Sequence, residues 1–289
     1  MAMGDDPIEC TRVREEALRV MVLSSRRAPG LERLISRAGR RWRIVGVVAS
    51  EPASEALEVA LKAGLPALVH DVRAFCAGRG VRLGDLAARR QYDRETLRIL
   101  RRLEVDLVLL CGYLLIVTEP LLDAFPGRIL NVHDSDLTRL DPEGVPRYRG
   151  LRSTRDAIVA GEKGTRSTVH LVTEEVDRGP LVIRSWSFPI PPLVDAAIRW
   201  GADDVLGAYA YAHREWMMRA SWGAILERAL DRMAAGEVHL LGGQAVVAGA
   251  LGPEDVEPEE PLRVADAGRG RAIEAQAGPR LRKLARGLG

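Results

Sequence analysis

"LRVMVLSSRRAPGLERLISRAGRRWRIVGVVA", residues 18–49, contains two apolar strands with one helix between them. Residues 18–23 and 43–49 are short apolar runs rich in Val, and residues 31–38 carry apolar side chains at helical spacing. A strand, a helix and a second strand in this order place the two strands parallel, because the helix returns the chain to the starting edge of the sheet. This stretch therefore predicts a parallel sheet covered by helices.

The same alternation continues along the chain. It predicts helices at residues 55–63, 93–103 and 153–160, and strands at residues 66–69, 106–111, 129–132, 167–172 and 181–188. From Asp71 onward, before the helix at 93–103, the sequence indicates a polar loop that contains glycine. Three prolines at 189, 191 and 192 end the alternation, and residues 205–234 then have the pattern of one long helix. The predicted fold class is α/β, a doubly wound, mostly parallel sheet with a C-terminal helical extension packed on it.

These elements divide the chain into four parts. We expect an N-terminal extension at residues 1–17, an α/β domain at 18–190, a helical segment packed on it at 191–251 and a flexible tail at 252–289. The tail is expected because Pro, Glu, Gly, Ala and Arg dominate from Gly252 onward, which leaves few apolar side chains to bury.

Composition excludes several classes of protein. The 289 residues include 42 basic and 40 acidic ones, mostly interleaved, so the formal net charge of +2 gives no electrostatic reason to expect a nucleic-acid partner. No segment reaches the roughly 18 apolar residues of a membrane span, and residues 1–10 do not resemble a signal peptide. The three cysteines, Cys10, Cys76 and Cys111, are widely spaced, which indicates a reducing compartment and no metal site. We expect a cytoplasmic protein that acts without a metal.

Four polar residues lie at or near the ends of predicted strands. Asn131 and His133 close the strand in ILNVHDSDL, residues 129–137, while His170 and Asp177 belong to RSTVHLVTEEVDRGPLVI, residues 166–183. Each has an ordinary structural explanation alone, since a histidine at a strand end is more often structural than catalytic and an aspartate before Arg-Gly-Pro commonly forms a turn. Ligands of open α/β sheets bind at the carboxyl ends of the strands. An amide donor, an imidazole and a carboxylate gathered there would suit acyl transfer.

The order of these motifs resembles a known family. Asn-Val-His at 131–133, RYRGLRSTRDAI at 147–158 and the segment at 166–183 are similar to N-I-H-P-S-L-L-P, Y-x-G-L and G-T-S-V-H-x-V-T-x-x-x-D-x-G-P of the folate-dependent formyltransferases, such as phosphoribosylglycinamide formyltransferase. The resemblance covers roughly residues 18–188. It implies a Rossmann-like formyltransferase catalytic domain at residues 18–190.

The resemblance also implies roles for residues. Asn131, His133 and Asp177 would be catalytic, stabilising the oxyanion that forms when an amine attacks the formyl carbon of 10-formyltetrahydrofolate. The folate would be held by the segment after the fourth strand and by the turn near Asp177, with His170 beside it. The implied folate-binding residues are Tyr113, Leu114, Leu115, Ile116, Val117, His170, Val172, Thr173 and Gly179.

The acceptor side departs from the family pattern. Relatives have a G-N-G-S-N loop whose amides hold a phosphate, whereas this chain has Ser24, Ser25, Arg26 and Arg27, which could hold an anion through side chains or form a solvated loop.

Beside His133 the family has Pro-Ser, but this chain has Asp134 and, two residues on, Asp136, which would repel a phosphate and attract an amine. From the long helix the polar candidates are His213, Arg214 and Glu215, and Glu215 is taken as an acceptor residue.

The predicted activity is formyl transfer to a primary amine, with phosphoribosylglycinamide of purine biosynthesis as the first candidate. Another amine such as an amino-sugar, or a non-catalytic folate-binding module, remains an alternative. A dinucleotide-binding enzyme is disfavoured because no G-x-G-x-x-G follows the first strand. The expected partners are the small-molecule amine and reduced folate, with the chain a monomer or homodimer.

Overall fold

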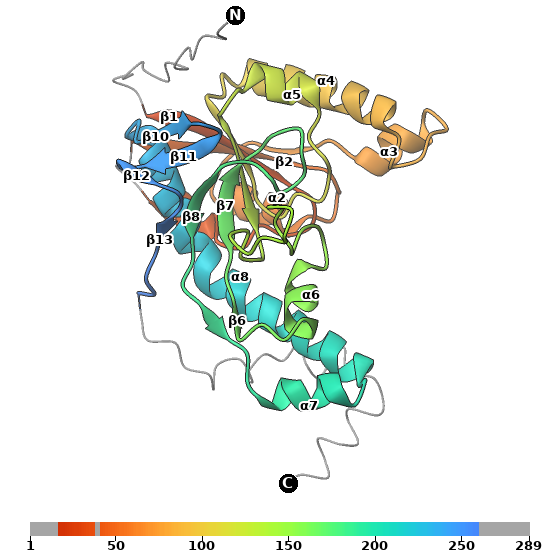
Figure 1. The fold of residues 1–289 in the computed structure, drawn as a ribbon. Coiled ribbons are helices and arrows are strands. Elements are labelled where there is room, and N and C mark those ends of the chain that lie inside the picture. Colours follow the sequence, from red (N-terminus) through yellow and green to blue (C-terminus); the bar gives the residue numbers. More distant parts are fainter. Residues whose placement is uncertain (1–16, 38–40, 260–289) are drawn as a thin grey trace, which may run out of the picture.

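The computed structural model describes residues 17–37 and 41–259 and shows one eight-stranded sheet with helices on both faces (Figure 1). The order across the sheet is β13-β8-β7-β5-β4-β1-β2-β3. Its strands are β1 (Leu18–Ser24), β2 (Trp42–Ala49), β3 (Ala67–Val69), β4 (Leu107–Leu110), β5 (Ile129–His133), β7 (Thr168–Leu171), β8 (Leu181–Arg184) and β13 (Glu254–Asp255). The helices are α1 (Leu31–Ser36), α2 (Glu55–Lys62), α3 (Val72–Ala77), α4 (Leu86–Arg102), α5 (Glu119–Ala124), α6 (Ser153–Val159), α7 (Leu193–Arg199) and α8 (Asp203–Ala234).

Strand direction divides the sheet into two parts. The neighbours β3, β2, β1, β4 and β5 pair in parallel, while β7 pairs antiparallel with both β5 and β8. The central strands are buried on both faces, as parallel strands under helices must be. In β1, Val20 and Val22 pack in one hydrophobic cluster, and Met21 and Leu23 pack in the cluster on the other face. The predicted fold class is therefore confirmed.

Different helices fill the two clusters. Side chains of α1, α2 and α8 pack with the first, and side chains of α4 and α5 pack with the second. Within α8, the predicted long helix, Trp222, Ile225 and Leu226 lie against the sheet. The beginning of α8 extends past the sheet and packs with α6 and α7, through a small cluster that includes Ile158 and Leu206 (Figure 1).

The segment predicted as a polar loop before residue 93 is largely helical. It contains α3 and the first turns of α4, which begins at Leu86. Aspartates cap both helices: Asp71 accepts hydrogen bonds from the backbone N–H groups of Arg73 and Ala74, and Asp85 from that of Ala88. Such caps satisfy backbone donors at helix starts, and they outweighed the glycine signals in this segment. The short helices α5 and α7 were also not predicted.

The end of the segment predicted as helical, 191–251, forms strands instead. These are β10 (Val238–Leu241), β11 (Gln244–Val247) and β12 (Ala250–Leu251). Outside this segment, β6 (Gly164–Thr165) pairs with β9 (Phe188–Pro189). Two-residue turns connect the three strands, Gly242-Gly243 with φ of 56° and 80°, and Ala248-Gly249 with φ of 49° and 84°. Positive φ at both turn positions matches the twist of a hairpin, which explains the strands.

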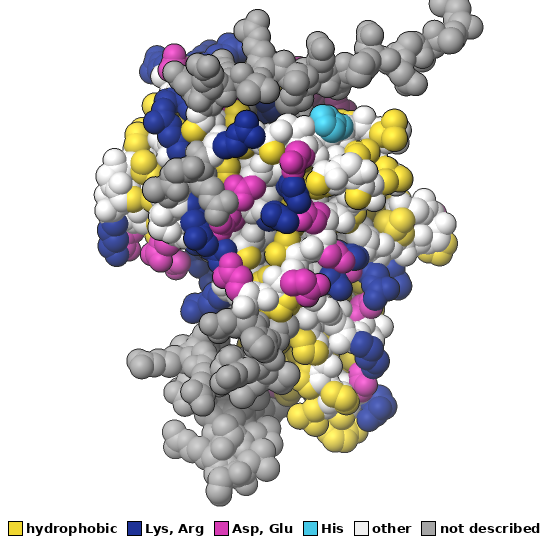
Figure 2. Space-filling model, turned by 90° about the vertical axis from the view of Figure 1, so that its left-hand side faces the viewer, with side chains coloured by type: hydrophobic (Ala, Val, Ile, Leu, Met, Phe, Trp, Pro, Cys, Tyr) yellow, Lys and Arg dark blue, Asp and Glu magenta, His cyan; other side chains and the backbone are white. Residues whose placement is uncertain are grey.

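Part of the predicted tail joins the sheet. In β13, Glu254 and Asp255 pair in parallel with β8, and their carboxylates form ion pairs with Arg232 and Arg184. Basic and acidic side chains are interleaved over the face shown in Figure 2. The expected N-terminal extension up to residue 16 and the tail from residue 260 lie outside the described residues, and the domain boundaries stay a prediction.

Candidate active site

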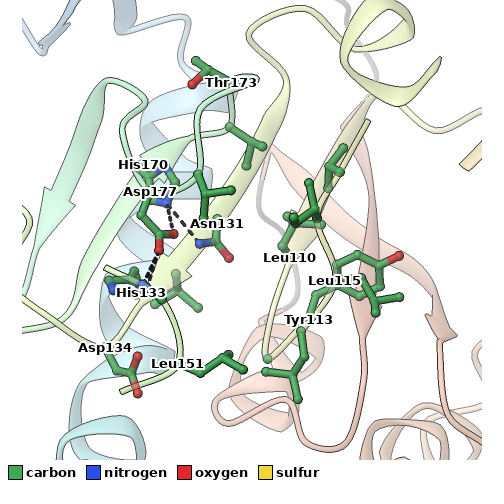
Figure 3. Close-up of a pocket in the computed structure, with 18 of the residues that line it drawn as sticks. Leu110, Tyr113, Leu115, Asn131, His133, Asp134, Leu151, His170, Thr173 and Asp177 are labelled. Carbon is green, nitrogen blue, oxygen red and sulfur yellow. Dashed lines mark hydrogen bonds and ion pairs between the residues drawn. The ribbon is translucent and has the colours of Figure 1, made fainter. Parts of the chain in front are cut away.

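A cavity of about 320 Å³ opens where β4 and β5 end (Figure 3). One wall is the segment 113–117 after β4, and the other combines the end of β5 with residues 172–177 after β7. The lining comprises Leu110, Gly112, Tyr113, Leu114, Leu115, Ile116, Val117, Asn131, Val132, His133, Asp134, Gly150, Leu151, His170, Val172, Thr173, Glu174, Glu175, Val176, Asp177, Arg214 and Trp222. The cavity is thus mostly apolar, with a few polar groups converging on one side, as in small-molecule sites.

Strand register brings Asn131 and His170 together. The two residues are direct partners in the antiparallel pair of β5 and β7. Asn131 Nδ2 lies 3.0 Å from His170 Nε2, and His170 Nδ1 lies 2.9 Å from the Leu171 carbonyl oxygen. Because a carbonyl only accepts, Nδ1 of His170 carries a proton, while Nε2 faces both the amide of Asn131 and the carboxylate of Asp177. This amide has a second N–H group, which is available to a ligand.

Asp177 lies between the two histidines. Its Oδ2 is 3.6 Å from His133 Nδ1, and its Oδ1 is 3.7 Å from His170 Nε2 (Figure 3). Its backbone has φ of 55°, a conformation that costs a non-glycine residue energy, and the Gly150 N–H donates to Oδ2 at 2.8 Å. Burial raises the pKa of Asp177, but His170, the charge of His133 and the Gly150 N–H outweigh burial and hold that pKa below its usual range. Asp177 is therefore a carboxylate beside His133.

His133 is buried and both ring nitrogens face protein groups. Nε2 donates to the Tyr148 carbonyl at 3.1 Å, and Nδ1 faces Asp177. The same carbonyl accepts a hydrogen bond from Ser135 Oγ at 2.5 Å. The Tyr148 carbonyl oxygen therefore still accepts a hydrogen bond from Ser135 when His133 Nε2 turns toward a ligand. His133 can thus exchange the carbonyl for a ligand at a small cost in free energy.

The apolar wall at 113–117 is fixed from behind. Leu114 N–H donates to Ser25 Oγ at 2.9 Å, and Arg89 of α4 donates to the Ile116 carbonyl from Nε at 3.2 Å. Arg89 is ion-paired with Asp93, which accepts from Thr118 N–H and Oγ at 2.8 and 2.7 Å. Both charged side chains are buried. The wall is thus tied to α4 by a buried ion pair and its hydrogen bonds.

Two glycines allow the backbone to approach closely. A Cβ at Gly112, whose φ is 65°, would lie 2.0 Å from the Arg27 carbonyl oxygen, and a Cβ at Gly179 would lie 1.7 Å from the Leu171 carbonyl oxygen. No side chain fits at either position. Gly179 therefore supports the turn at 172–177 from outside, although it does not line the cavity itself.

Most of the residues proposed for the acceptor lie elsewhere. Ser24, Ser25, Arg26, Arg27 and Glu215 do not line the cavity. Arg27 and Glu215 form a two-pronged ion pair at 2.7 and 2.6 Å, which occupies both terminal nitrogens of the arginine. Arg26 is exposed and pairs with Glu51 at 3.2 Å, while the Ser24 and Ser25 hydroxyls bond to the protein. The polar side chains of residues 24–27 are therefore already bonded to other residues of the chain.

The carboxylates after His133 are also not free. Asp134 is buried in the cavity wall and ion-paired with Arg214 Nε. Asp136 accepts the Thr138 hydroxyl at 2.5 Å and lies 3.7 Å from Arg184. Arginines of α8 and β8, which a single sequence does not connect to Asp134 and Asp136, thus lie beside both carboxylates, and the expected repulsion of a phosphate stays a prediction.

Some lining residues were not singled out from the sequence. Gly150, Leu151 and Trp222 line the cavity, and Leu151 is 76% exposed. Gly150 and Leu151 belong to the Y-x-G-L pattern, which was the available signal. Trp222 carried no signal beyond an aromatic residue in a helix.

Within residues 17–37 and 41–259, no three side chains of His, Cys, Asp or Glu are grouped closely enough to hold a metal ion. None of the helices in this part of the chain is both long and apolar enough to cross a membrane.

Chemically, the polar side of the cavity can stabilise negative charge. The second N–H of Asn131 and the Nε2–H of His133 are donors, and the Asp177 carboxylate lies 3.6 Å from His133 Nδ1. Such a set suits addition to a carbonyl carbon beside an apolar slot.

Comparison with known proteins points to one family. Residues 18–196, more than half of the chain, match the formyl transferase family. The trifunctional purine biosynthetic protein adenosine-3 of Drosophila melanogaster is 33% identical over 179 residues, and the phosphoribosylglycinamide formyltransferase of Haemophilus influenzae is 41% identical over 93 residues. The aligned parts cover 60% and 32% of this chain, but only 12% and 40% of those two proteins.

Solved structures agree with this assignment. Glycinamide ribonucleotide transformylase 1 from Symbiobacterium toebii has a TM-score of 0.65 at 28% identity and covers 81% of this chain and 95% of that one. A formyltetrahydrofolate deformylase from Pseudomonas syringae shares the fold, with a TM-score of 0.59 at 20% identity, over 81% of this chain and 66% of that one. Together with the match over residues 18–196, which confirms the resemblance noted in the motifs, these likenesses show that the chain belongs to the formyl transferase family.

Proposed function

We propose that the chain transfers a formyl group from 10-formyltetrahydrofolate to a primary amine, with phosphoribosylglycinamide as the first acceptor to test. The observation that carries this proposal is the convergence of Asn131, His133 and Asp177 on one side of a cavity whose other wall is apolar. Membership of the formyl transferase family supports it, as do relatives named for phosphoribosylglycinamide and purine biosynthesis.

The donor is assigned to the apolar part of the cavity. The ring of the folate would lie between residues 113–117 and 172–177, since both segments line the cavity. His170 lies beside this part of the cavity and is fixed as the Nδ1–H form by Leu171. Gly112 and Gly179 let the two walls adopt the required path. The formyl carbon would then face Asn131 and His133.

The reaction needs one bond formed, one bond broken and one proton moved. The amine nitrogen bonds to the formyl carbon, and the carbonyl electrons move to the formyl oxygen. The free N–H of Asn131 and the Nε2–H of His133 donate to that oxygen. For this, His133 gives up its hydrogen bond to the Tyr148 carbonyl oxygen, which still accepts one from Ser135. Asp177 stabilises the charged ring and, through water, relays the proton of the amine to the donor nitrogen as its bond to the formyl carbon breaks.

The acceptor is less constrained than the donor. Transfer to another amine, such as an amino-sugar, and a folate-binding module without catalysis are the remaining alternatives. We keep the cytoplasm as the expected compartment, without nucleic-acid or metal partners, and a monomer or homodimer as the expected assembly.

The test is a spectroscopic assay of tetrahydrofolate release from 10-formyltetrahydrofolate. Reactions contain phosphoribosylglycinamide, a panel of amino-sugars, or water alone, with His133→Gln as the variant and Glu58→Gln as the control. Glu58 is an exposed residue of α2 that pairs only with its neighbour Lys62 among the described residues.

Turnover with an amine that falls by about 10²–10³-fold in His133→Gln, but not in the control, would support the proposal. Turnover with water alone would instead indicate a hydrolase. Folate binding without turnover under any condition would favour the non-catalytic alternative.

A further inference from the structure

Arg214 is the cationic side chain in the lining of the described cavity. It comes from α8, and its side chain is 29% exposed. Its Nε atom pairs with Asp134, the residue that follows His133. Among the described residues, no hydrogen bond or ion pair occupies Nη1 or Nη2 of Arg214. The guanidinium is thus held at one nitrogen while the other two remain available.

The neighbouring arginines differ in this respect. Arg27 gives both terminal nitrogens to Glu215, and Arg26 is exposed beside Glu51, and neither lines the cavity. A planar guanidinium with two free terminal nitrogens matches the paired oxygens of a carboxylate or phosphate. Arg214 has this geometry on the cavity wall, which the loop 24–27 lacks.

Asp134 fixes the orientation of the Arg214 guanidinium group. The carboxylate is buried, and Ser153 Oγ also donates to it, at 3.4 Å. An ion pair through Nε holds the guanidinium plane in one orientation, so a ligand that binds the Nη atoms loses less side-chain entropy. Asp134 also lines the cavity, and its negative charge is paired with Nε of Arg214.

The other charges of the cavity indicate which end takes an anion. Glu174 and Glu175 belong to the turn that contains Thr173, and Figure 3 places Thr173 at the end of the view opposite Asp134 and Leu151. At the Asp134 end, Arg149 and Arg152 are exposed on either side of the lining residues Gly150 and Leu151. Arg214, paired with Asp134, therefore lies at the end of the cavity opposite the turn that carries Glu174 and Glu175.

We infer that Arg214 binds an anionic group of the amine acceptor, a phosphate monoester or a carboxylate. The inference rests on the proposed function and names the class of substrate: an amine that carries an oxyanion group. It moves the anion site from the loop 24–27, where the sequence suggested it, to α8.

The experiment compares matched acceptors in the full chain. The phosphate arm uses phosphoribosylglycinamide and its dephosphorylated ribonucleoside, and the carboxylate arm uses an α-amino acid and its amide. Each is measured by kcat/KM and, independently of turnover, by calorimetric binding. The variants are Arg214→Gln, Arg214→Lys and Arg199→Gln, the last an exposed arginine of α7 outside the cavity lining with the same change of charge.

We expect wild-type protein to favour the anionic member of one pair, and Arg214→Gln to weaken that member by about 10- to 100-fold while leaving the neutral one nearly unchanged. Arg214→Lys should recover part of the loss, because lysine keeps the positive charge but lacks the two terminal nitrogens of a guanidinium group. Arg199→Gln should behave as wild type. The arm that shows the effect identifies the anion.

An unchanged ratio in Arg214→Gln, in both kcat/KM and binding, would overturn the inference. If no amine is turned over, the proposed function fails, yet calorimetry still decides the site: Arg214-dependent binding of an anionic amine supports it, and binding that is absent or independent of Arg214 refutes it.

Discussion

Neutralising Asp93 is expected to loosen the cavity wall although Asp93 does not line the cavity. Asp93 is fully buried, Arg89 is 3% exposed, and the pair ties 116–118 to α4. Asp93→Asn preserves the size of the side chain but leaves the charge of Arg89 buried without a counter-ion. Arg89→Gln leaves the carboxylate unpaired in the same way and removes the donors to the Ile116 carbonyl at 3.2 and 3.1 Å.

The magnitude follows from burial. Breaking a buried ion pair by removing one partner costs about 3–5 kcal/mol, because the remaining charge is uncompensated. The double variant, Arg89→Gln with Asp93→Asn, has no uncompensated charge. It should be no less stable than either single variant, which corresponds to a coupling energy of at least about 3 kcal/mol.

Urea unfolding of the four proteins measures this coupling, and steady-state kinetics adds a second readout. Because residues 113–117 are assigned to the donor, the KM for 10-formyltetrahydrofolate should rise in each single variant more than the KM for the amine. Destabilisations that simply add would refute the coupling. Lost stability with an unchanged donor KM would refute the positioning role.

Three further predictions concern single residues. Burial lowers the pKa of His213 to about 4, so between pH 4 and about 6.5 the unfolded chain binds a proton that the folded chain does not, and stability falls as the pH drops through this range. In urea unfolding from pH 7 to 4, the variant His213→Gln should lack this loss of stability, which is on the order of 3 kcal/mol. The same dependence of stability on pH in the variant and in wild type would contradict the prediction. The pKa of Asp177 is lowered in the folded protein, so the ionised side chain stabilises the fold above its unfolded pKa of about 3.9, and this stabilisation is lost as the pH falls toward the folded pKa. In thermal unfolding, Asp177→Asn should be less stable than wild type at pH 7, and this difference in stability should shrink below about pH 3.9. A difference that does not depend on pH would contradict the prediction. Gly179→Ala would place Cβ 1.7 Å from the Leu171 carbonyl oxygen, so it should cost about 1–3 kcal/mol or more and weaken folate binding in calorimetry; Gly84→Ala, with nothing within 4 Å of its Cβ, is the matched control, and equal behaviour of the two would contradict the steric argument.

The sequence predicted the sheet well because its signals are local. Residues 18–49 carry strand, helix and strand patterns in one stretch, and the structure places β1 and β2 side by side in parallel. The grouping of Asn131 with His170 also follows from local order, since neighbouring strands in the chain pair with one another and bring these residues into register. The catalytic roles of Asn131, His133 and Asp177 stay a prediction.

Long-range ion pairs could not be predicted in this way. Arg27 and Glu215 are 188 residues apart, and Arg214 and Asp134 are 80 apart, and no periodicity connects such positions. The charged side chains of 24–27 are engaged within the chain, Arg27 with Glu215 of α8 and Arg26 with Glu51, which the sequence alone does not show. The strands β10 and β11 were missed for another reason, since Gly242-Gly243 between two apolar runs is a hairpin signal that the preceding long helix masked.

We propose that Asn131 and His133 promote transfer of the formyl group to an amine. The most direct measurement uses 10-formyltetrahydrofolate with an isotope-labelled formyl group and follows the label into the N-formyl product by mass spectrometry, in wild type, Asn131→Ala and His133→Gln. We expect labelled product in wild type and a rate lower by about 10²-fold or more in each variant, with the fold unchanged by circular dichroism. Label recovered only as formate, or variants that transfer it as fast as wild type, would contradict this role of Asn131 and His133.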